Sequence, residues 1–219
     1  MSLEAAQRNP VFRQKLFANF MKADDELSYQ MYSQKKLALF KDVTGKVLEI
    51  GPGTGVNFRF LPKNCQWQGV EPNPAMHPFL KKTAKDYGFH DIQFAGLAKN
   101  TFNLADNSQD FIISTLVLCS VPNVRQTLSE IKRVLKPKGK FIFIEHVVDT
   151  ENTFRKVIQK TMPYTPWRYF SDGCDPSRDI ATDINQAGFS SVALTQYKQQ
   201  GAGIIMSVNR PHIFGTAVK

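Results

Sequence analysis

The chain has 219 residues, of which 42% are hydrophobic and 21% are charged, and its formal net charge is +9. This length suits one large domain, and this composition excludes a disordered chain and a fold that needs disulfide or metal staples. The three cysteines are widely spaced and form no CxxC pair, so the sequence predicts neither a disulfide framework nor a metal site and favours a reducing compartment.

The first part of the chain is predicted to be helical. In residues 1–44 apolar side chains recur near helical spacing, among them Val11, Phe12, Leu16, Phe20 and Met21. A second helical piece is predicted from about Ser28 to Phe40.

From Gly45 onward, short apolar segments alternate with helix-like stretches. This pattern is typical of a parallel sheet that is covered by helices on both faces. Two further apolar segments, separated by Gly201, Gly203 and Pro211, are expected to pair antiparallel at the sheet edge. The sequence therefore predicts a doubly wound α/β fold. The predicted strands are Lys46–Ile50, Trp67–Val70, Ile92–Phe94, Phe111–Leu116, Lys140–Glu145, Ser191–Tyr197 and His212–Val218, and the predicted helices are Asn57–Leu61, Pro74–Tyr87, Val124–Leu135 and Ser177–Ala187.

The sharpest local signal is the run Val47–Gly55, in which a short strand leads directly into a glycine-rich turn. Glycine permits the positive φ angles and the close backbone approach that a ligand needs there, and the following helix offers free N–H groups. The third glycine comes two residues after the second, unlike the GxGxxG spacing of dinucleotide-binding turns. About twenty residues on, the next strand ends in Glu71, where an acidic side chain can accept both hydroxyls of a ribose.

Four segments together resemble the class I S-adenosylmethionine-dependent methyltransferases of the type 11 small-molecule group. Leu48–Gly55 resembles their glycine loop and Glu71-Pro72-Asn73 their ribose-binding turn. Ala105–Asp110 resembles the turn into their fourth strand, and Leu128–Lys140 the helix and turn before their fifth. The resemblance covers about residues 45–150 and implies a mostly parallel, seven-stranded, Rossmann-like sheet with an antiparallel edge hairpin.

The resemblance also implies that S-adenosyl-L-methionine is the cofactor. Many relatives place an acidic residue just after the third strand, where it accepts a hydrogen bond from the adenine amino group. Here Gly96–Asn100 contains no acid, so Asn100 or backbone groups are expected to substitute. The expected cofactor-binding residues are Glu49, Gly51, Gly53, Gly55, Glu71, Pro72, Asn73, Ala98 and Leu116.

A narrower resemblance, to the methyltransferase-like thiol S-methyltransferases, extends toward the C-terminus. That family acts on small alkyl thiols and associates with membranes and lipid droplets through an N-terminal hydrophobic segment. This chain shows no such segment, so we expect no transmembrane segment, and peripheral membrane contact stays open. The resemblance is carried by Asn57–Phe60, Thr115–Val121, Glu145–Val147, Asp172–Cys174 and the ending Arg210–Lys219.

Methyl transfer from a sulfonium needs alignment, and it needs a base only if the acceptor arrives protonated. A thiol of pKa about 8.5 is already partly ionised at neutral pH. His146, directly after the fifth predicted strand, is the candidate base, and packing at the strand end is the alternative. Cys119 is expected to be a buried structural thiol, with a place on the wall of the substrate pocket as the alternative. His212 is expected to belong to the edge hairpin, and His77 and His90 to lie on the surface.

Aromatic and apolar residues crowd the segment after the fifth predicted strand, where Pro163 and Pro166 break helices. We expect this segment to form an apolar wall of the substrate pocket together with the N-terminal helices. The residues concerned are Phe154, Met162, Tyr164, Trp167, Tyr169 and Phe170.

The sequence thus predicts an enzyme that transfers a methyl group to a small, fairly apolar molecule, with a thiol as the narrower expectation. The alternatives are a methyltransferase acting on nucleic acid or protein and a non-catalytic, cofactor-binding regulatory protein. A nucleic-acid substrate is disfavoured because the excess of basic over acidic residues is spread along the chain. It is two in residues 1–44, four in residues 45–150 and three in residues 151–219. In addition, Leu116–Cys119 stands where amino-methylating nucleic-acid enzymes often carry an Asn/Asp-Pro-Pro-aromatic motif.

The expected organisation is a helical extension or lid over residues 1–44 and a methyltransferase domain over residues 45–219. Within that domain the cofactor half covers about residues 45–150 and the substrate-side half about residues 151–219. With no signal-peptide pattern in the sequence, the expected location is cytoplasmic.

Overall fold

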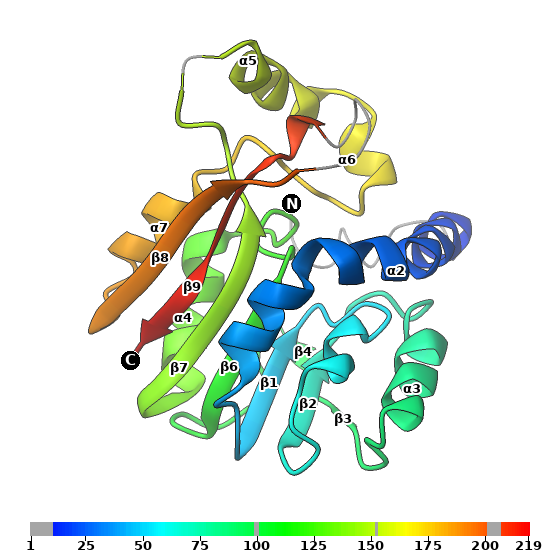
Figure 1. The fold of residues 1–219 in the computed structure, drawn as a ribbon, viewed down its shortest axis with the longest axis vertical. Helices are drawn as coiled ribbons and strands as arrows, with labels where there is room; N and C mark the ends of the chain where they lie inside the picture. Colours follow the sequence, from blue (N-terminus) through cyan, green and yellow to red (C-terminus); the bar gives the residue numbers. More distant parts are fainter. Residues whose placement is uncertain (1–10, 99–100, 152, 201–206) are drawn as a thin grey trace.

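A computed structural model of the protein describes residues 11–98, 101–151, 153–200 and 207–219. Its centre is a seven-stranded sheet in the order β3-β2-β1-β6-β7-β9-β8 (Figure 1). The first five of these strands run parallel, and β9 runs antiparallel to both of its neighbours. The predicted doubly wound α/β fold with an antiparallel edge pair is confirmed. The strands are β1 (Lys46–Ile50), β2 (Gln66–Val70), β3 (Gln93–Phe94), β6 (Gln109–Thr115), β7 (Leu135–His146), β8 (Ser191–Lys198) and β9 (Pro211–Val218).

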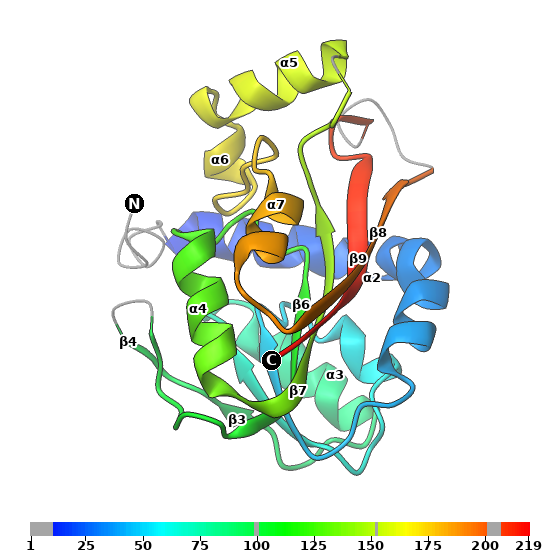
Figure 2. The same cartoon turned by 90° about the vertical axis from the view of Figure 1, so that its left-hand side faces the viewer.

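Helices cover both faces of this sheet (Figure 2). One face is covered by α4 (Val124–Val134) and α7 (Ile180–Gln186), and the other by η1 (Val56–Arg59), α3 (His77–Asp86) and part of α2 (Val11–Phe40). Beyond the carboxyl end of β7 lie α5 (Phe154–Thr161), η2 (Met162–Tyr164) and α6 (Trp167–Phe170) (Figure 1). A separate two-stranded sheet joins β4 (Leu97–Ala98) to β5 (Thr101–Phe102). Gly201 and Gly203, expected between the edge strands, lie outside the described residues.

Two cores, one on each face, explain why the central strands carry consecutive apolar residues. Ile112 and Ile113 are neighbours in β6, so their side chains point to opposite faces, and both are fully buried. Ile112 belongs to the cluster that includes Leu128 of α4, and Ile113 to the cluster that includes Leu80 of α3. A parallel sheet buried on both faces needs such continuous apolar runs.

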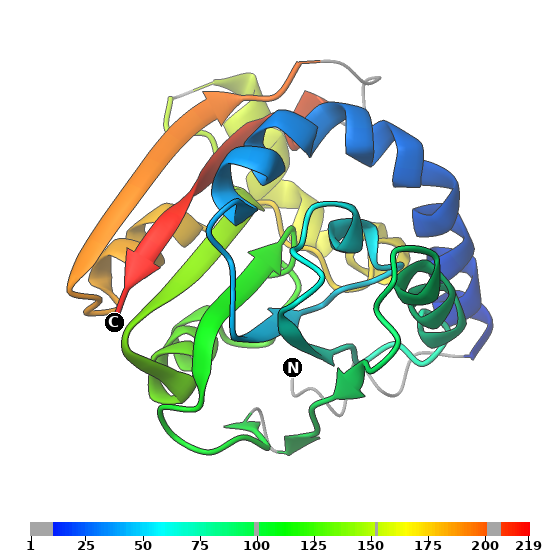
Figure 3. The same ribbon diagram turned by 60° about the horizontal axis from the view of Figure 1, so that its bottom comes forward.

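The N-terminal helix differs from the sequence prediction. Instead of two pieces, α2 is one helix of 30 residues that arches over the side of the sheet occupied by η1 and α3 (Figure 3). Four of the five apolar side chains named for the first piece are exposed, with 77% exposure at Phe12 and 64% at Phe20, and only Met21 is half-buried. The buried side of α2 carries the polar Gln14, Asp25 and Lys36 together with Ala18, Tyr32 and Phe40. No helix in the described part of the chain is long and apolar enough to cross a membrane.

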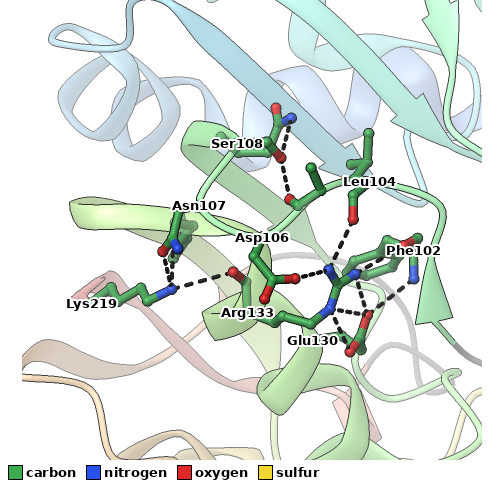
Figure 4. Close-up of polar contacts among 11 residues, drawn as sticks. Phe102, Leu104, Asp106, Asn107, Ser108, Glu130, Arg133 and Lys219 are labelled. Atoms are coloured by element: carbon green, nitrogen blue, oxygen red, sulfur yellow. Dashed lines mark hydrogen bonds and ion pairs between the residues drawn. The ribbon is translucent and has the colours of Figure 1, made fainter.

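A polar network anchors the turn that leads into β6 (Figure 4). The Arg133 guanidinium on α4 donates to the backbone oxygens of Phe102 (3.0 Å) and Leu104 (2.9 Å) and to the carboxylates of Asp106 and Glu130. Glu130 in turn accepts from the backbone N–H of Phe102 at 3.2 Å. One cation therefore ties β5 and the following turn to α4.

Candidate functional site

A cavity of about 210 Å³ lies where β1, β2 and β6 end. β1 stands between β2 and β6, so the chain leaves it in opposite directions on its two sides, and such a switch point is where open α/β sheets hold ligands. The wall residues are Phe17, Met21, Asp24, Asp25, Ser28 and Lys36 of α2; Glu49–Thr54, Val56 and Asn57 of β1 and its turn; Val70–Pro72 and Met76; and Phe102, Thr115–Val117, Ser120–Pro122, Thr127 and Asp172.

The glycine turn presents bare backbone to this cavity. Gly51 and Gly53 have φ angles of 58° and 57°, a left-handed conformation that favours glycine. A Cβ added at Gly51 would stand 2.7 Å from the Val117 Cγ2, whereas one added at Gly53 would meet nothing within 4 Å. The first glycine is therefore required by packing, and the second leaves open space beside the chain. That space is a cradle in which a ligand can approach the backbone.

Glu71 directly follows β2 and is hydrogen-bonded to the glycine turn. Its Oε2 accepts from the backbone N–H of Gly53 at 2.9 Å, and its Oε1 accepts from the backbone N–H of Asn73 at 2.8 Å. Burial raises the pKa of Glu71 to about 7, although these two hydrogen bonds oppose the rise. Each carboxylate oxygen can accept a further hydrogen bond, so Glu71 retains acceptor capacity for ligand hydroxyls.

Glu49 is fully enclosed behind the glycine turn. Its two oxygens accept from the Asn57 Nδ2 at 2.8 Å and from the Trp67 Nε1 at 2.9 Å. Burial raises the pKa of Glu49 above its usual value. Asn57 also donates to the Thr115 hydroxyl at 3.2 Å, so these contacts join β1, β2 and β6 at the cavity.

The wall beside β6 is held in an unusual conformation. Leu116 has a φ of 59°, which is uncommon for a residue with a side chain, and its N–H donates to the Ile144 oxygen at 2.8 Å. The fully buried Glu145 accepts from the backbone N–H groups of Val117 (3.0 Å) and Leu118 (3.1 Å). Burial raises the pKa of Glu145 to about 8. Strained backbone of this kind persists where its surroundings over-determine it, and it gathers at functional sites.

Polar contacts also tie α2 to the cavity. The buried Asp25 accepts from the Thr54 hydroxyl in the glycine turn and from the Lys22 ammonium at 2.6 Å. The Asn73 side chain donates to the Gln14 backbone oxygen at 3.3 Å. These contacts explain why the polar side of α2 faces inward.

Most of the residues expected to bind the cofactor line this one cavity, namely Glu49, Gly51, Gly53, Glu71, Pro72 and Leu116. Gly55 and Asn73 do not. Gly55 makes room for Leu80 and Phe58, each 3.0 Å from the place of its missing Cβ, and Asn73 links α2 to the loop after β2. Ala98 lies in β4, but its side chain is outside the described part, as is all of Asn100.

His146, the candidate base that was expected beside the methyl group, does not lie on the wall of this cavity. His146 is the last residue of β7, is buried and does not line the cavity. Because neighbouring strand residues point to opposite faces, Glu145 reaches the cavity wall while His146 turns away. Its Nε2 lies 3.2 Å from the Cys174 Sγ.

Cys119, His146 and Cys174 form a buried cluster whose ligand-type atoms all lie within 4.8 Å of one another. All three cysteines of the chain are free and buried, as expected for Cys119. A hydrogen bond from Cys174 lowers the pKa of the Cys119 thiol well below its usual value. Burial alone would lower the pKa of His146, but its interaction with the neighbouring Cys119 is among the effects that raise this pKa above its usual value. The expectation from sequence spacing missed this set of soft donors because its members come from three separate segments: the turn after β6, the end of β7 and the loop after α6.

The residues of the predicted aromatic wall do not border this cavity. None of the six residues named for it lines the cavity, and Phe154 and Tyr164 are 80% and 91% exposed. The segment contributes Asp172 instead, and the apolar side chains come from Phe17 and Met21 of α2. Sequence reasoning also missed Phe102 of β5, and it missed Lys36 and Asp25, for which the only available signal was the polar face of α2.

Comparison with known proteins gives concordant results. Residues 48–143 match the family model described as "Methyltransferase domain". The chain is 37% identical over 202 residues to thiol S-methyltransferase TMT1B of Rattus norvegicus, which covers 88% of this chain and 81% of the relative. It is 34% identical over 217 residues to thiol S-methyltransferase TMT1A of Homo sapiens, and this match covers 94% of this chain and 86% of the relative.

Solved structures share the fold at low identity. A putative methyltransferase in complex with the Haloferax volcanii Trm112 activator has a TM-score of 0.69 at 17% identity, covering 94% of this chain and 96% of that chain. A Haemonchus contortus phosphoethanolamine N-methyltransferase 2 in complex with S-adenosyl-L-methionine has a TM-score of 0.61 at 15% identity, and the match covers 85% of this chain and 52% of that chain.

Proposed function

Because the chain belongs to the S-adenosylmethionine-dependent methyltransferases, and within them to the thiol S-methyltransferases, we propose that it methylates a small, fairly apolar thiol with S-adenosyl-L-methionine as the methyl donor. The observation that carries this proposal is the single cavity that joins the glycine turn to Glu71 at the end of β2.

The residues present fit the cofactor. The open space at Gly53 lets a ligand approach the backbone, and Glu71 keeps acceptor capacity for the two ribose hydroxyls. Gly51, Pro72 and Leu116 would border the bound cofactor on the same cavity wall. When bound, the cofactor supplies a methyl carbon on a positively charged sulfur, an electrophile that a thiolate attacks directly.

The chain's own contribution is to hold and enclose the reactants. Phe17, Met21 and Val117 give the cavity apolar walls that suit an apolar acceptor and exclude water. A free thiol has a pKa of about 8.5, so a useful fraction is ionised at neutral pH without a dedicated base. We therefore assign no proton transfer to His146, which lies outside the cavity.

The test is methyl transfer from labelled S-adenosyl-L-methionine to a panel of acceptors: a small alkyl thiol, the matching alcohol, a quinone precursor, a lipid and RNA. The proposal expects transfer to the thiol alone, with a rate that rises with pH as the thiol ionises. Transfer to RNA or to the alcohol instead of the thiol would contradict the substrate class. Cofactor binding without transfer to any acceptor would favour a regulatory protein.

A further inference from the structure

Lys36 is the one basic side chain among the described residues that line the cavity. The same wall carries five acidic side chains, from Asp24, Asp25, Glu49, Glu71 and Asp172. Lys36 projects from α2 and is fully buried. Its position gives a strongly acidic cavity a single point of positive charge.

The Lys36 ammonium has no hydrogen-bond partner among the described residues. Burial lowers its pKa to about 8, against the attraction of Glu49 and Asp25. An ammonium held out of water without an acceptor is costly, because no protein group replaces its lost hydration. A buried lysine of this kind is explained where a bound ligand supplies the hydrogen-bond acceptors that the ammonium lacks.

The nearby acidic groups do not supply those acceptors. Neither Glu49 nor Asp25 forms a hydrogen bond with the Lys36 Nζ; the Glu49 oxygens instead accept from Asn57 and Trp67, and the Asp25 oxygens from Thr54 and Lys22. The Lys36 Nζ lies 5.8 Å and 5.6 Å from the ring centroids of Tyr32 and Phe60, so those sides are closed by aromatic surface. The missing acceptor therefore has to come from what fills the cavity.

We propose that Lys36 binds the carboxylate of the cofactor's amino-acid end. The inference rests on the proposed function and extends it by assigning a residue to the one negatively charged group that the cofactor carries. That end of the cofactor is a zwitterion, with a carboxylate and an ammonium on the same carbon. A cavity wall that sets Lys36 among acidic side chains matches both charges, since the carboxylate meets the lysine and the ammonium meets the acids.

The acceptor's thiolate is the other anion that enters this cavity, so the experiment must separate the two. The probes are S-adenosylhomocysteine and its decarboxylated analogue, which differ only in the carboxylate. Calorimetry measures the affinity of both for the wild-type protein, for Lys36→Met and for Lys36→Gln. Lys35→Met is the matched control, because Lys35 is the preceding residue of the same helix, packs on the Tyr197 ring at 4.0 Å and does not line the cavity.

The wild-type protein and Lys35→Met are expected to bind S-adenosylhomocysteine roughly 10- to 100-fold more tightly than the decarboxylated analogue. Lys36→Met and Lys36→Gln are expected to bind the two compounds alike, at about the level of the analogue on wild type. Their melting temperatures without ligand are expected to be no lower than that of wild type, because the substitution removes an unpaired buried charge.

Equal binding of the two compounds by the wild-type protein would overturn the inference without any variant. A preference for the carboxylate that survives in Lys36→Met would overturn it too, and a raised KM for the thiol in that variant would move Lys36 to the acceptor side. If the wild-type protein binds neither compound, the proposed function itself fails, which is a separate result.

Discussion

Replacing Glu71 by alanine tests the proposed cofactor site most directly. The substitution removes the carboxylate that grips the N–H groups of Gly53 and Asn73, and with it the proposed acceptor for the ribose hydroxyls. The glycine turn keeps its other anchor, the hydrogen bond from the Gly51 N–H to the Val70 oxygen at 2.8 Å. The fold is therefore expected to persist while the ligand contact is lost.

The magnitude follows from the contacts. Hydrogen bonds to a charged acceptor contribute about 1.5–3 kcal/mol each, and water that enters the vacated space recovers part of the loss of two such bonds. A net loss of about 2–3 kcal/mol corresponds to S-adenosylhomocysteine binding that is roughly 30- to 150-fold weaker. Without ligand the cost is smaller, because burial already disfavours the Glu71 carboxylate and raises its pKa to about 7.

The assay is calorimetric titration with S-adenosylhomocysteine, together with thermal melting of the free protein. Glu71→Gln is expected to fall between wild type and Glu71→Ala, since the amide keeps one acceptor oxygen but turns an N–H toward a backbone donor. Glu151→Ala is the matched control, because Glu151 pairs with Lys198 on the surface and does not line the cavity. Binding by Glu71→Ala within twofold of wild type, with unchanged melting, would refute the reasoning.

Three further results are expected. Affinity for S-adenosylhomocysteine should be about fivefold weaker at pH 6 than at pH 8, because the Glu71 carboxylate of pKa about 7 protonates as the pH falls, while about half of the Lys36 ammonium of pKa about 8 is already lost at pH 8. Titrations of Glu71→Gln should lose this rise in affinity with pH. His146→Ala should keep the wild-type pH profile of thiol methylation but unfold at a temperature lower by about 3–9 °C, since a buried side chain is lost, and rescue of its activity by alkali would restore a base role. Arg133→Met should lose about 2–4 kcal/mol of unfolding free energy in urea titrations, because the substitution leaves Glu130 and two backbone oxygens without their hydrogen-bond donor. An unchanged urea midpoint would mean that the network in Figure 4 contributes nothing to stability.

The sequence by itself determined the local elements and their order. Consecutive apolar residues such as Phe111-Ile112-Ile113 mark strands that are buried on both faces, and the structure places β6 there. The glycine spacing after β1 and the acid after β2 are equally local sequence signals, because a strand end that admits a ligand needs these residue types at these positions. For that reason the position of the proposed cofactor cavity was predictable without coordinates.

Side-chain direction at the ends of the elements was decided only by tertiary packing. Glu145 and His146 are adjacent, and the twist and register of β7 send the first to the cavity wall and the second to Cys174. Sequence proximity to a strand end could not distinguish them.

The inner face of α2 was likewise decided by its partners. Its apolar residues recur near helical spacing, yet Phe12 and Phe20 are exposed, and Asp25 and Lys36 are buried. Hydrophobic periodicity assumes that a helix covers an apolar core, whereas α2 covers a cavity lined by both apolar and charged side chains, where the charged ones find partners in other segments or in a ligand. Those partners are distant in sequence, so only the folded chain brings them within reach.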